Sequence, residues 1–240
     1  MNFKKILSAI VNPKTHWDYY KLYINLTKWS SQGILPYASS LPDRISLTSQ
    51  FWSKVKELHQ LTLADEHERA VGVWWIDGDI CITPNQRGER SSVTSQYSLR
   101  VGYFPQQDPK YYTKQVEVDS KVIFSKTVGV SEIPEKSVIS SLFNLHTHPP
   151  HYNELDGKKH RYYHFFSRTD IGSLISGDTL ISGVITDEVY LLFKTNQTPR
   201  YLPDHIQDRT ITPELLFSDL GLVQYKGSWS TAVFDKVTFN

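Results

Sequence analysis

The sequence predicts an α/β protein in which helices flank a mixed β-sheet, with a helical extension at the N-terminus. Apolar residues repeat every three or four positions near the N-terminus and again over residues 46–63, which is typical of amphipathic helices. From residue 68 onward the pattern changes to short apolar runs separated by turn residues, with one helical segment at 167–176. Of the 240 residues, 39% are hydrophobic, which is enough for a sizeable core.

Two helices are expected before the first strand. The first follows the helix breaker Pro13, carries Trp17 and Trp29, and ends at Gly33. A loop rich in proline and serine, residues 36–43, separates it from the second helix at 46–63. The apolar face of the second helix is expected to consist of Phe51, Val55, Leu58 and Leu61. We therefore predict an N-terminal helical extension at 1–44 and one domain at 45–240.

The rest of the chain is expected to be mostly strands. Residues 70–76 and 80–83 flank the turn Asp77-Gly78-Asp79, which predicts a hairpin. Further strands are expected at 92–104, 115–124, 138–145, 180–186 and 189–194. Ser167 is a favourable first residue for the short helix at 167–176.

Composition restricts the classes of partner. The net charge is +1 and charged residues make up 21%, so no basic footprint for nucleic acid or for a membrane surface is expected. The apolar run 6–11 is ended by Asn12-Pro13, too early for the core of a signal peptide. Cys81 is the only cysteine, which excludes an internal disulfide. We expect a cytoplasmic protein with a neutral protein or small-molecule partner, and neither nucleic acid nor membrane as partner.

Two histidines and a downstream aspartate form the pattern with the clearest chemistry. The first part reads His146-Thr147-His148-Pro149, and the second reads Ser167-Arg168-Thr169-Asp170. Pro149 and Pro150 place the end of the preceding strand at His148, and the chain then leads through a loop to the helix that carries Asp170. Two imidazoles and a carboxylate with an open fourth position describe a catalytic zinc site. Single histidines at strand ends are more often surface or hydrogen-bonded residues, but the combination favours zinc held by His146, His148 and Asp170.

This combination resembles the signature of the JAMM metalloproteases, also called the MPN-plus family. That signature is a Glu on an early strand, then His-x-His-Pro, then Ser-x-x-Asp, and here it reads Glu68, residues 146–149 and residues 167–170. The resemblance covers about residues 46–194. It implies a JAMM/MPN (cytidine-deaminase-like) architecture and a zinc hydrolase that cleaves amide or isopeptide bonds. The implied substrate is a conjugate of ubiquitin or a ubiquitin-like protein, cut after the C-terminal tail.

The resemblance also implies roles for two catalytic residues. Glu68 would take a proton from the attacking water and pass it to the leaving amine, and Ser167 would donate a hydrogen bond to the developing oxyanion. Ser167 with Asp170 equally fits a helix N-cap with an acid in the first turn, and the two roles can coexist. Glu66 lies on the same predicted strand face as Glu68. We favour Glu68 as the base, because the apolar part of the strand would shield it better.

Several alternatives stay open. An insertion at about residues 152–166, rich in basic and aromatic residues, could cover the cleft, contact a protein substrate or be a solvated decoration. The chain could be a non-catalytic MPN-type scaffold, although a complete ligand set favours chemistry. It could also be a JAMM hydrolase that releases a small amino acid or a sulfur carrier from a protein tail. A cupin is a distant alternative, because Glu154 follows the histidine pair at nearly the spacing of a cupin ligand.

Overall fold

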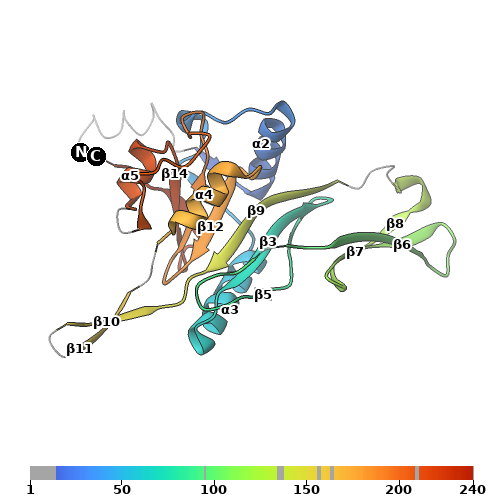
Figure 1. The fold of residues 1–240 in the computed structure, drawn as a ribbon. Helices are drawn as coiled ribbons and strands as arrows, with labels where there is room; N and C mark the ends of the chain where they lie inside the picture. Colours follow the sequence, from blue (N-terminus) through green and yellow to red (C-terminus); the bar gives the residue numbers. More distant parts are fainter. Residues whose placement is uncertain are drawn as a thin grey trace, which may run out of the picture.

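Helices lie on both faces of a mixed, curled β-sheet in the computed structural model (Figure 1). The structure describes residues 15–94, 96–133, 138–155, 158–162, 165–208 and 211–239. The apolar run at 6–11 lies outside the described residues. This arrangement confirms the predicted α/β class with a mixed sheet. Within the described parts of the chain, no helix is both long and apolar enough to cross a bilayer.

The two predicted helices are present. Helix α2 (Tyr19–Gln32) starts after Asp18, whose carboxylate accepts a hydrogen bond from the backbone N–H of Lys21, and ends at Gly33 in the left-handed conformation (φ 62°). Helix α3 (Ser49–Asp65) starts after Thr48. Its buried face consists of Phe51, Trp52, Val55, Leu58 and Thr62. Leu61 was predicted on this face, and that was wrong: its side chain is 36% exposed, because the next position of the buried stripe after Leu58 falls on Thr62.

The main sheet has ten strands among the described residues, in the order β1-β2-β15-β14-β13-β12-β9-β3-β4, with β5 also paired to β3. Strand β9 pairs parallel to β12 and antiparallel to β3. The strand bounds are β1 (His16–Trp17), β2 (Arg44–Ser46), β3 (Arg69–Ile76), β4 (Asp79–Ile82), β5 (Gln86–Arg87), β9 (Ile139–Thr147), β12 (Ile181–Ile185), β13 (Val189–Phe193), β14 (Val223–Ser228) and β15 (Val233–Lys236). The predicted hairpin is therefore present as β3 and β4, with positive φ at Asp77 and Gly78 in its turn.

One predicted strand is wrong, because residues 115–124 contain a turn. Strand β7 (Tyr111–Val118) reverses at Asp119 and Ser120, both with positive φ, into strand β8 (Lys121–Gly129). With β6 (Leu99–Pro105) these strands form a separate three-stranded sheet that projects from the body (Figure 1). The strand predicted at 92–104 is correspondingly shorter, since its described residues before Leu99 lie outside β6.

The main sheet has a core on each face. Helices α2 and α3 pack on one face, against side chains that include Phe143 and Leu145 of β9. Helix α4 (Arg168–Ser176) and helix α5 (Pro213–Ser218) pack on the other face, against Val184 and Leu192. Consecutive residues of β12 face opposite cores, since Ile185 belongs to the first core and Val184 to the second.

The N-terminal segment contributes to the same sheet. Strand β2 pairs with β15 near the C-terminus, and β1 pairs with β2. Leu22 and Leu26 of α2 belong to the core that also contains α3. The division into 1–44 and 45–240 stays a prediction. Two short 3-10 helices, Ala38–Ser40 and Val130–Glu132, complete the structure together with strands β10 (His151–Leu155) and β11 (Lys158–Tyr162).

Candidate metal centre

The two histidines of the motif lie at the end of β9. His146 is paired with Ala70 of β3 on one side and with Val184 of β12 on the other. Strand β9 ends at Thr147, and His148 continues along β12 by donating its backbone N–H to the carbonyl of Ile185 (2.9 Å). Residues two apart on a strand point to the same side, so the two imidazoles leave the sheet together.

The aspartate comes from the first turn of α4, which Ser167 caps. The hydroxyl of Ser167 accepts a hydrogen bond from the backbone N–H of Asp170 (3.2 Å) and donates one to Oδ2 of Asp170 (2.7 Å). The backbone N–H of Ser167 donates to the same oxygen (2.8 Å), which completes a capping box. These bonds fix the carboxylate and engage Oδ2, so that Oδ1 is the oxygen left for another partner.

The three side chains converge, with one ligand atom from each within 4.8 Å of the others. His146 Nε2 lies 3.0 Å from His148 Nε2 and 3.2 Å from Asp170 Oδ1, and His148 Nε2 lies 3.4 Å from Asp170 Oδ2. Ligands bound tetrahedrally at zinc distances are about 3.3 Å apart, because each bond is about 2.0–2.1 Å long. The group could therefore hold a metal ion. Two neutral nitrogens and one carboxylate suit zinc, although they do not by themselves select it.

The surroundings of Asp170 favour the ionised form of its side chain. Burial by itself would raise its pKa, but the neighbouring His146 and His148 outweigh burial and hold the pKa of Asp170 well below its usual range. A divalent cation bound between the two imidazole nitrogens and the ionised carboxylate of Asp170 would stabilise the negative charge of that carboxylate.

Glu68 lies beside this group, in the segment that joins α3 to β3. Its backbone is held on both sides: its N–H donates to the carbonyl of Glu89 and its carbonyl accepts from the N–H of Gly88, both at 2.9 Å. The residue is buried, and burial raises the pKa of the Glu68 carboxyl to about 7, with Asp170 adding to the rise and His148 opposing it. A carboxyl with this pKa can both accept and release a proton near neutral pH.

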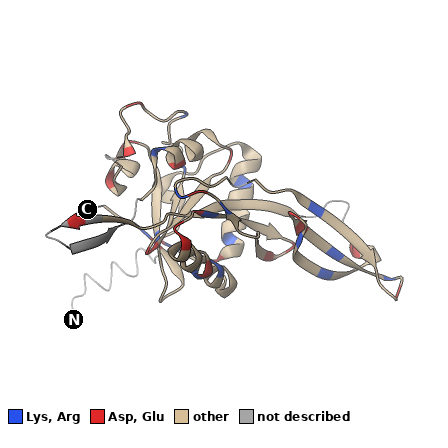
Figure 2. Cartoon of the chain, turned by 60° about the horizontal axis from the view of Figure 1, so that its bottom comes forward, with Lys and Arg blue, Asp and Glu red and all other residues tan. Residues whose placement is uncertain are grey.

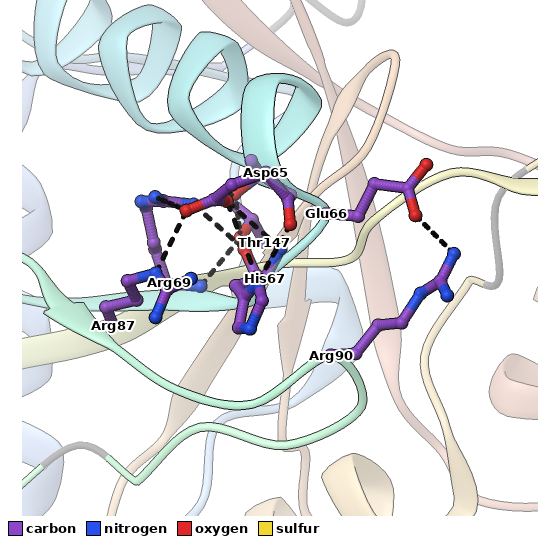
Figure 3. A network of polar contacts seen from close by, with 8 residues as sticks. Asp65, Glu66, His67, Arg69, Arg87, Arg90 and Thr147 are labelled. Carbon is purple, nitrogen blue, oxygen red and sulfur yellow. Dashed lines mark hydrogen bonds and ion pairs between the residues drawn. The ribbon is translucent and has the colours of Figure 1, made fainter.

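Glu66, the other candidate base, is directed elsewhere. It is the C-cap of α3, with a left-handed backbone (φ 57°), and β3 starts only at Arg69, so Glu66 and Glu68 do not share a strand face. Its carboxylate forms an ion pair with Arg90 (Figure 3). The cavity that Glu68 shares with the histidines is not lined by Glu66.

A polar network anchors the segment that carries Glu68 (Figure 3). Asp65 accepts two hydrogen bonds from Arg69, at 2.8 and 2.7 Å, and one from Arg87 at 2.9 Å. These guanidinium groups, with Arg69 first, hold the pKa of Asp65 well below its usual range. The network thus ties the last turn of α3 to β3 and β5, on either side of Glu68.

A cavity of about 740 Å³ is lined by Glu68 and by the His-His-Asp group. Its charged or polar lining is Glu68, Arg90, Ser91, Ser92, Asn144, His146, His148, His151, Ser167, Thr169, Asp170 and Asp208, and its apolar lining includes Val93, Phe165, Phe166 and Ile211. The sequence patterns did not single out Arg90 or Asp208, because their loops reach the cavity only through tertiary folding. The structure thus brings together all five predicted site residues. Ser167 lines the cavity and forms a hydrogen bond with Asp170.

The insertion predicted at about 152–166 forms a hairpin of β10 and β11, whose described strands project from the body (Figure 1). Its base borders the cavity through His151, Phe165 and Phe166. Residues 156–157 and 163–164 of the insertion lie outside the described residues. The described strands of the hairpin therefore extend outward from the rim of the cavity.

Replacing Ser167 with alanine is expected to weaken both the helix and the metal site. Loss of the cap should lower the free energy of unfolding by about 1 kcal/mol. Loss of the hydrogen bond to Oδ2 should lower metal affinity by roughly 10- to 100-fold. Chemical denaturation and competition with a chromophoric chelator would measure the two effects. Thr212→Ala removes the cap of α5 and is the control: it should reduce stability without changing metal affinity. An unchanged metal affinity in Ser167→Ala would show that Asp170 needs no support from the cap.

Comparisons with protein-family models, curated proteins and solved structures found no match. This chain is an α/β protein with a mixed sheet and a largely buried His-His-Asp group that could hold a metal ion. The buried carboxyl of Glu68, in the segment just before β3, shares the cavity of this group.

Proposed function

We propose that this protein is a zinc-dependent hydrolase of the JAMM/MPN type that cleaves amide or isopeptide bonds. One observation carries the proposal: the ligand atoms of His146, His148 and Asp170 lie within 4.8 Å of one another in the wall of a cavity that Glu68 also lines. The pairing of β3, β9 and β12 brings the early Glu, the His-x-His segment and the Ser-x-x-Asp helix together, as the JAMM resemblance requires.

In this proposal His146, His148 and Asp170 hold zinc. When bound, zinc polarises the scissile carbonyl and makes a water molecule acidic enough to react near neutral pH. Glu68 accepts the proton of the attacking water and delivers it to the leaving amine. In this proposal the single O–H proton of Ser167 turns from Asp170 to the developing oxyanion, while the backbone N–H of Ser167 continues to hold Asp170.

The proposed substrate is a conjugate of ubiquitin or a ubiquitin-like protein. The resemblance supports this choice, and the cavity is large enough for a peptide tail. Basic and acidic residues are both distributed along the chain in Figure 2, and the net charge is only +1, which supports a partner other than nucleic acid or an anionic membrane. A cytoplasmic location is part of the proposal, because the single cysteine is a free, buried thiol.

The first experiment is the metal content of the purified protein beside His148→Ala, by elemental analysis after removal of loosely bound ions. We expect about one zinc per wild-type chain and almost none in the variant, since two protein ligands rarely retain the ion. His205→Ala is the control, because His205 is exposed and distant in the chain from the motif. A well-folded wild-type protein that takes up no zinc would contradict the proposal and favour the MPN-type scaffold.

Substrate class is tested on the zinc-loaded protein. A linear ubiquitin fusion, an isopeptide-linked conjugate and a small peptide amide would be compared by mass spectrometry. Cleavage of the conjugate is the expected result. Cleavage of the small amide alone would favour the alternative hydrolase that releases an amino acid or a sulfur carrier, and zinc binding without any cleavage would favour the scaffold.

A further inference from the structure

Thr147 lies between the two histidines and faces the opposite side of β9. Its side chain is fully buried, whereas the imidazoles line the cavity. The His-x-His pattern leaves this middle position open, and nothing in the metal chemistry requires a threonine there.

The hydroxyl of Thr147 joins three segments of the chain. It lies 2.7 Å from the hydroxyl of Thr62 in the last turn of α3, and it accepts a hydrogen bond of 2.8 Å from the backbone N–H of Arg69 at the start of β3 (Figure 3). Arg69 itself is buried, so its N–H would lack a partner without this oxygen. Thr62 also lies within 3.4 Å of the Arg69 guanidinium.

This contact lies where the two strands separate. The register of β3 and β9 runs from Ile76–Ile139 to Ala70–His146 and stops there. Beyond it, His148 bonds to Ile185 of β12, while Glu68 bonds to Gly88 and Glu89. The ligand segment and the base segment therefore diverge after this point, which leaves room for the cavity. The Thr147 hydroxyl continues the ladder for one more bond, immediately before Glu68.

We infer that Thr147 is a positioning residue, whose hydroxyl fixes the segment of Glu68 relative to the histidines on either side of it. The expected effect on turnover rests on the proposed function. The hydrogen bond that joins the two segments does not depend on that function. A general base must lie within hydrogen-bond reach of its proton, and a displacement of about 1 Å can cost a large factor in rate. Loss of the hydroxyl should thus lower kcat while leaving substrate binding and metal content in place.

Hydrogen exchange tests the hold directly. In zinc-loaded Thr147→Val, which keeps the branched shape and loses the hydroxyl, the Arg69 amide should exchange about 10-fold faster than in the wild type. Thr147→Ser should restore the wild-type rate. Gly72 also lies in β3, and its amide donates to the hydroxyl of Thr83 (2.8 Å). The exchange rate of this amide should be unchanged in both variants. An Arg69 amide that is equally protected in Thr147→Val would overturn the inference.

Kinetics test the consequence. We expect kcat of Thr147→Val to fall by roughly 10- to 100-fold with KM changed by less than about twofold, and Thr147→Ser to recover most of it. Thr83→Val is the matched control: it removes an equivalent hydroxyl bond from β3 and should keep kcat within about threefold. An equal loss of kcat in the control, or a loss that Thr147→Ser does not restore, would show that Thr147 contributes only to stability and would contradict the inference.

The two proposals fail in different ways. A wild-type protein that cleaves no amide would refute the proposed function, and the exchange rate of the Arg69 amide would still decide whether the hydroxyl holds the two segments. If Thr147→Val does not fold, Thr147→Ala removes the same hydroxyl with a smaller side chain. An Arg69 amide as protected in Thr147→Ala as in the wild type would contradict the inference.

Discussion

The Glu68→Gln variant is expected to lose amide cleavage by about 10²- to 10⁴-fold in kcat, while its zinc content stays at the wild-type value. Glutamine preserves the size of the side chain, but it cannot act as a base. Steady-state kinetics on the best substrate, together with elemental analysis of the same preparation, would measure both quantities. The effect should be in kcat, because the proton transfer belongs to the chemical step.

Glu66→Gln is the matched control for this experiment. It makes the same chemical change two residues earlier, at a side chain that pairs with Arg90 instead of lining the cavity. Its kcat should stay within about threefold of the wild type. If Glu66→Gln lost activity and Glu68→Gln kept it, the base would be Glu66 and the assignment from the structure would be wrong. Loss of zinc in Glu68→Gln would instead give Glu68 a role in binding the ion.

The Phe143→Ala variant is expected to lose about 3–5 kcal/mol of unfolding free energy, which is the typical cost of removing a fully buried phenylalanine. Phe143 lies on β9, has no exposed surface and meets Phe51 of α3 edge-on at 6.2 Å between ring centroids. The deletion would open a cavity between that helix and the strand that carries both histidines. Urea unfolding of the metal-free protein, followed by circular dichroism, would measure the loss without a contribution from the ion.

Two further variants calibrate that measurement. Phe143→Leu keeps most of the buried volume and should lose much less stability than the alanine variant. Tyr201→Ala removes an aromatic ring that is 81% exposed and should change the unfolding free energy by less than about 0.5 kcal/mol. A loss in Phe143→Ala no larger than that of Tyr201→Ala would mean that α3 does not pack on β9 as described.

Local sequence was sufficient wherever an element is specified by neighbouring residues. The turn at Asp77-Gly78 needs a residue tolerant of positive φ, and Gly78 identified it. The turn between β7 and β8 has positive φ at Asp119 and Ser120 but contains no glycine, so the sequence read as one strand. The C-terminal elements α5, β14 and β15 were not predicted. Gly227 interrupts the apolar pattern of β14, and β15 has few buried residues of its own.

The choice between the two glutamates depended on where α3 ends and β3 begins. The alternation of side chains along an assumed strand placed Glu66 and Glu68 on one face. In the structure α3 extends to Asp65 and Glu66 adopts the left-handed conformation that ends it, so the strand starts later and only Glu68 faces the ligands. Helix length was decided by packing of Thr62 and the ion pairs of Asp65, which involve residues far along the chain.

The sequence by itself determined the α/β class and the His-His-Asp group that could hold a metal ion, because hydrophobic periodicity and the types and spacing of His146, His148 and Asp170 are local properties. It also determined the cap of α4, since Ser167 and Asp170 bond within one turn. Only the tertiary structure decided which glutamate lines the cavity, which loops border it and which residues Thr147 contacts. These contacts arise from the pairing of β3, β9 and β12, and strand pairing depends on burial of all three strands between two cores.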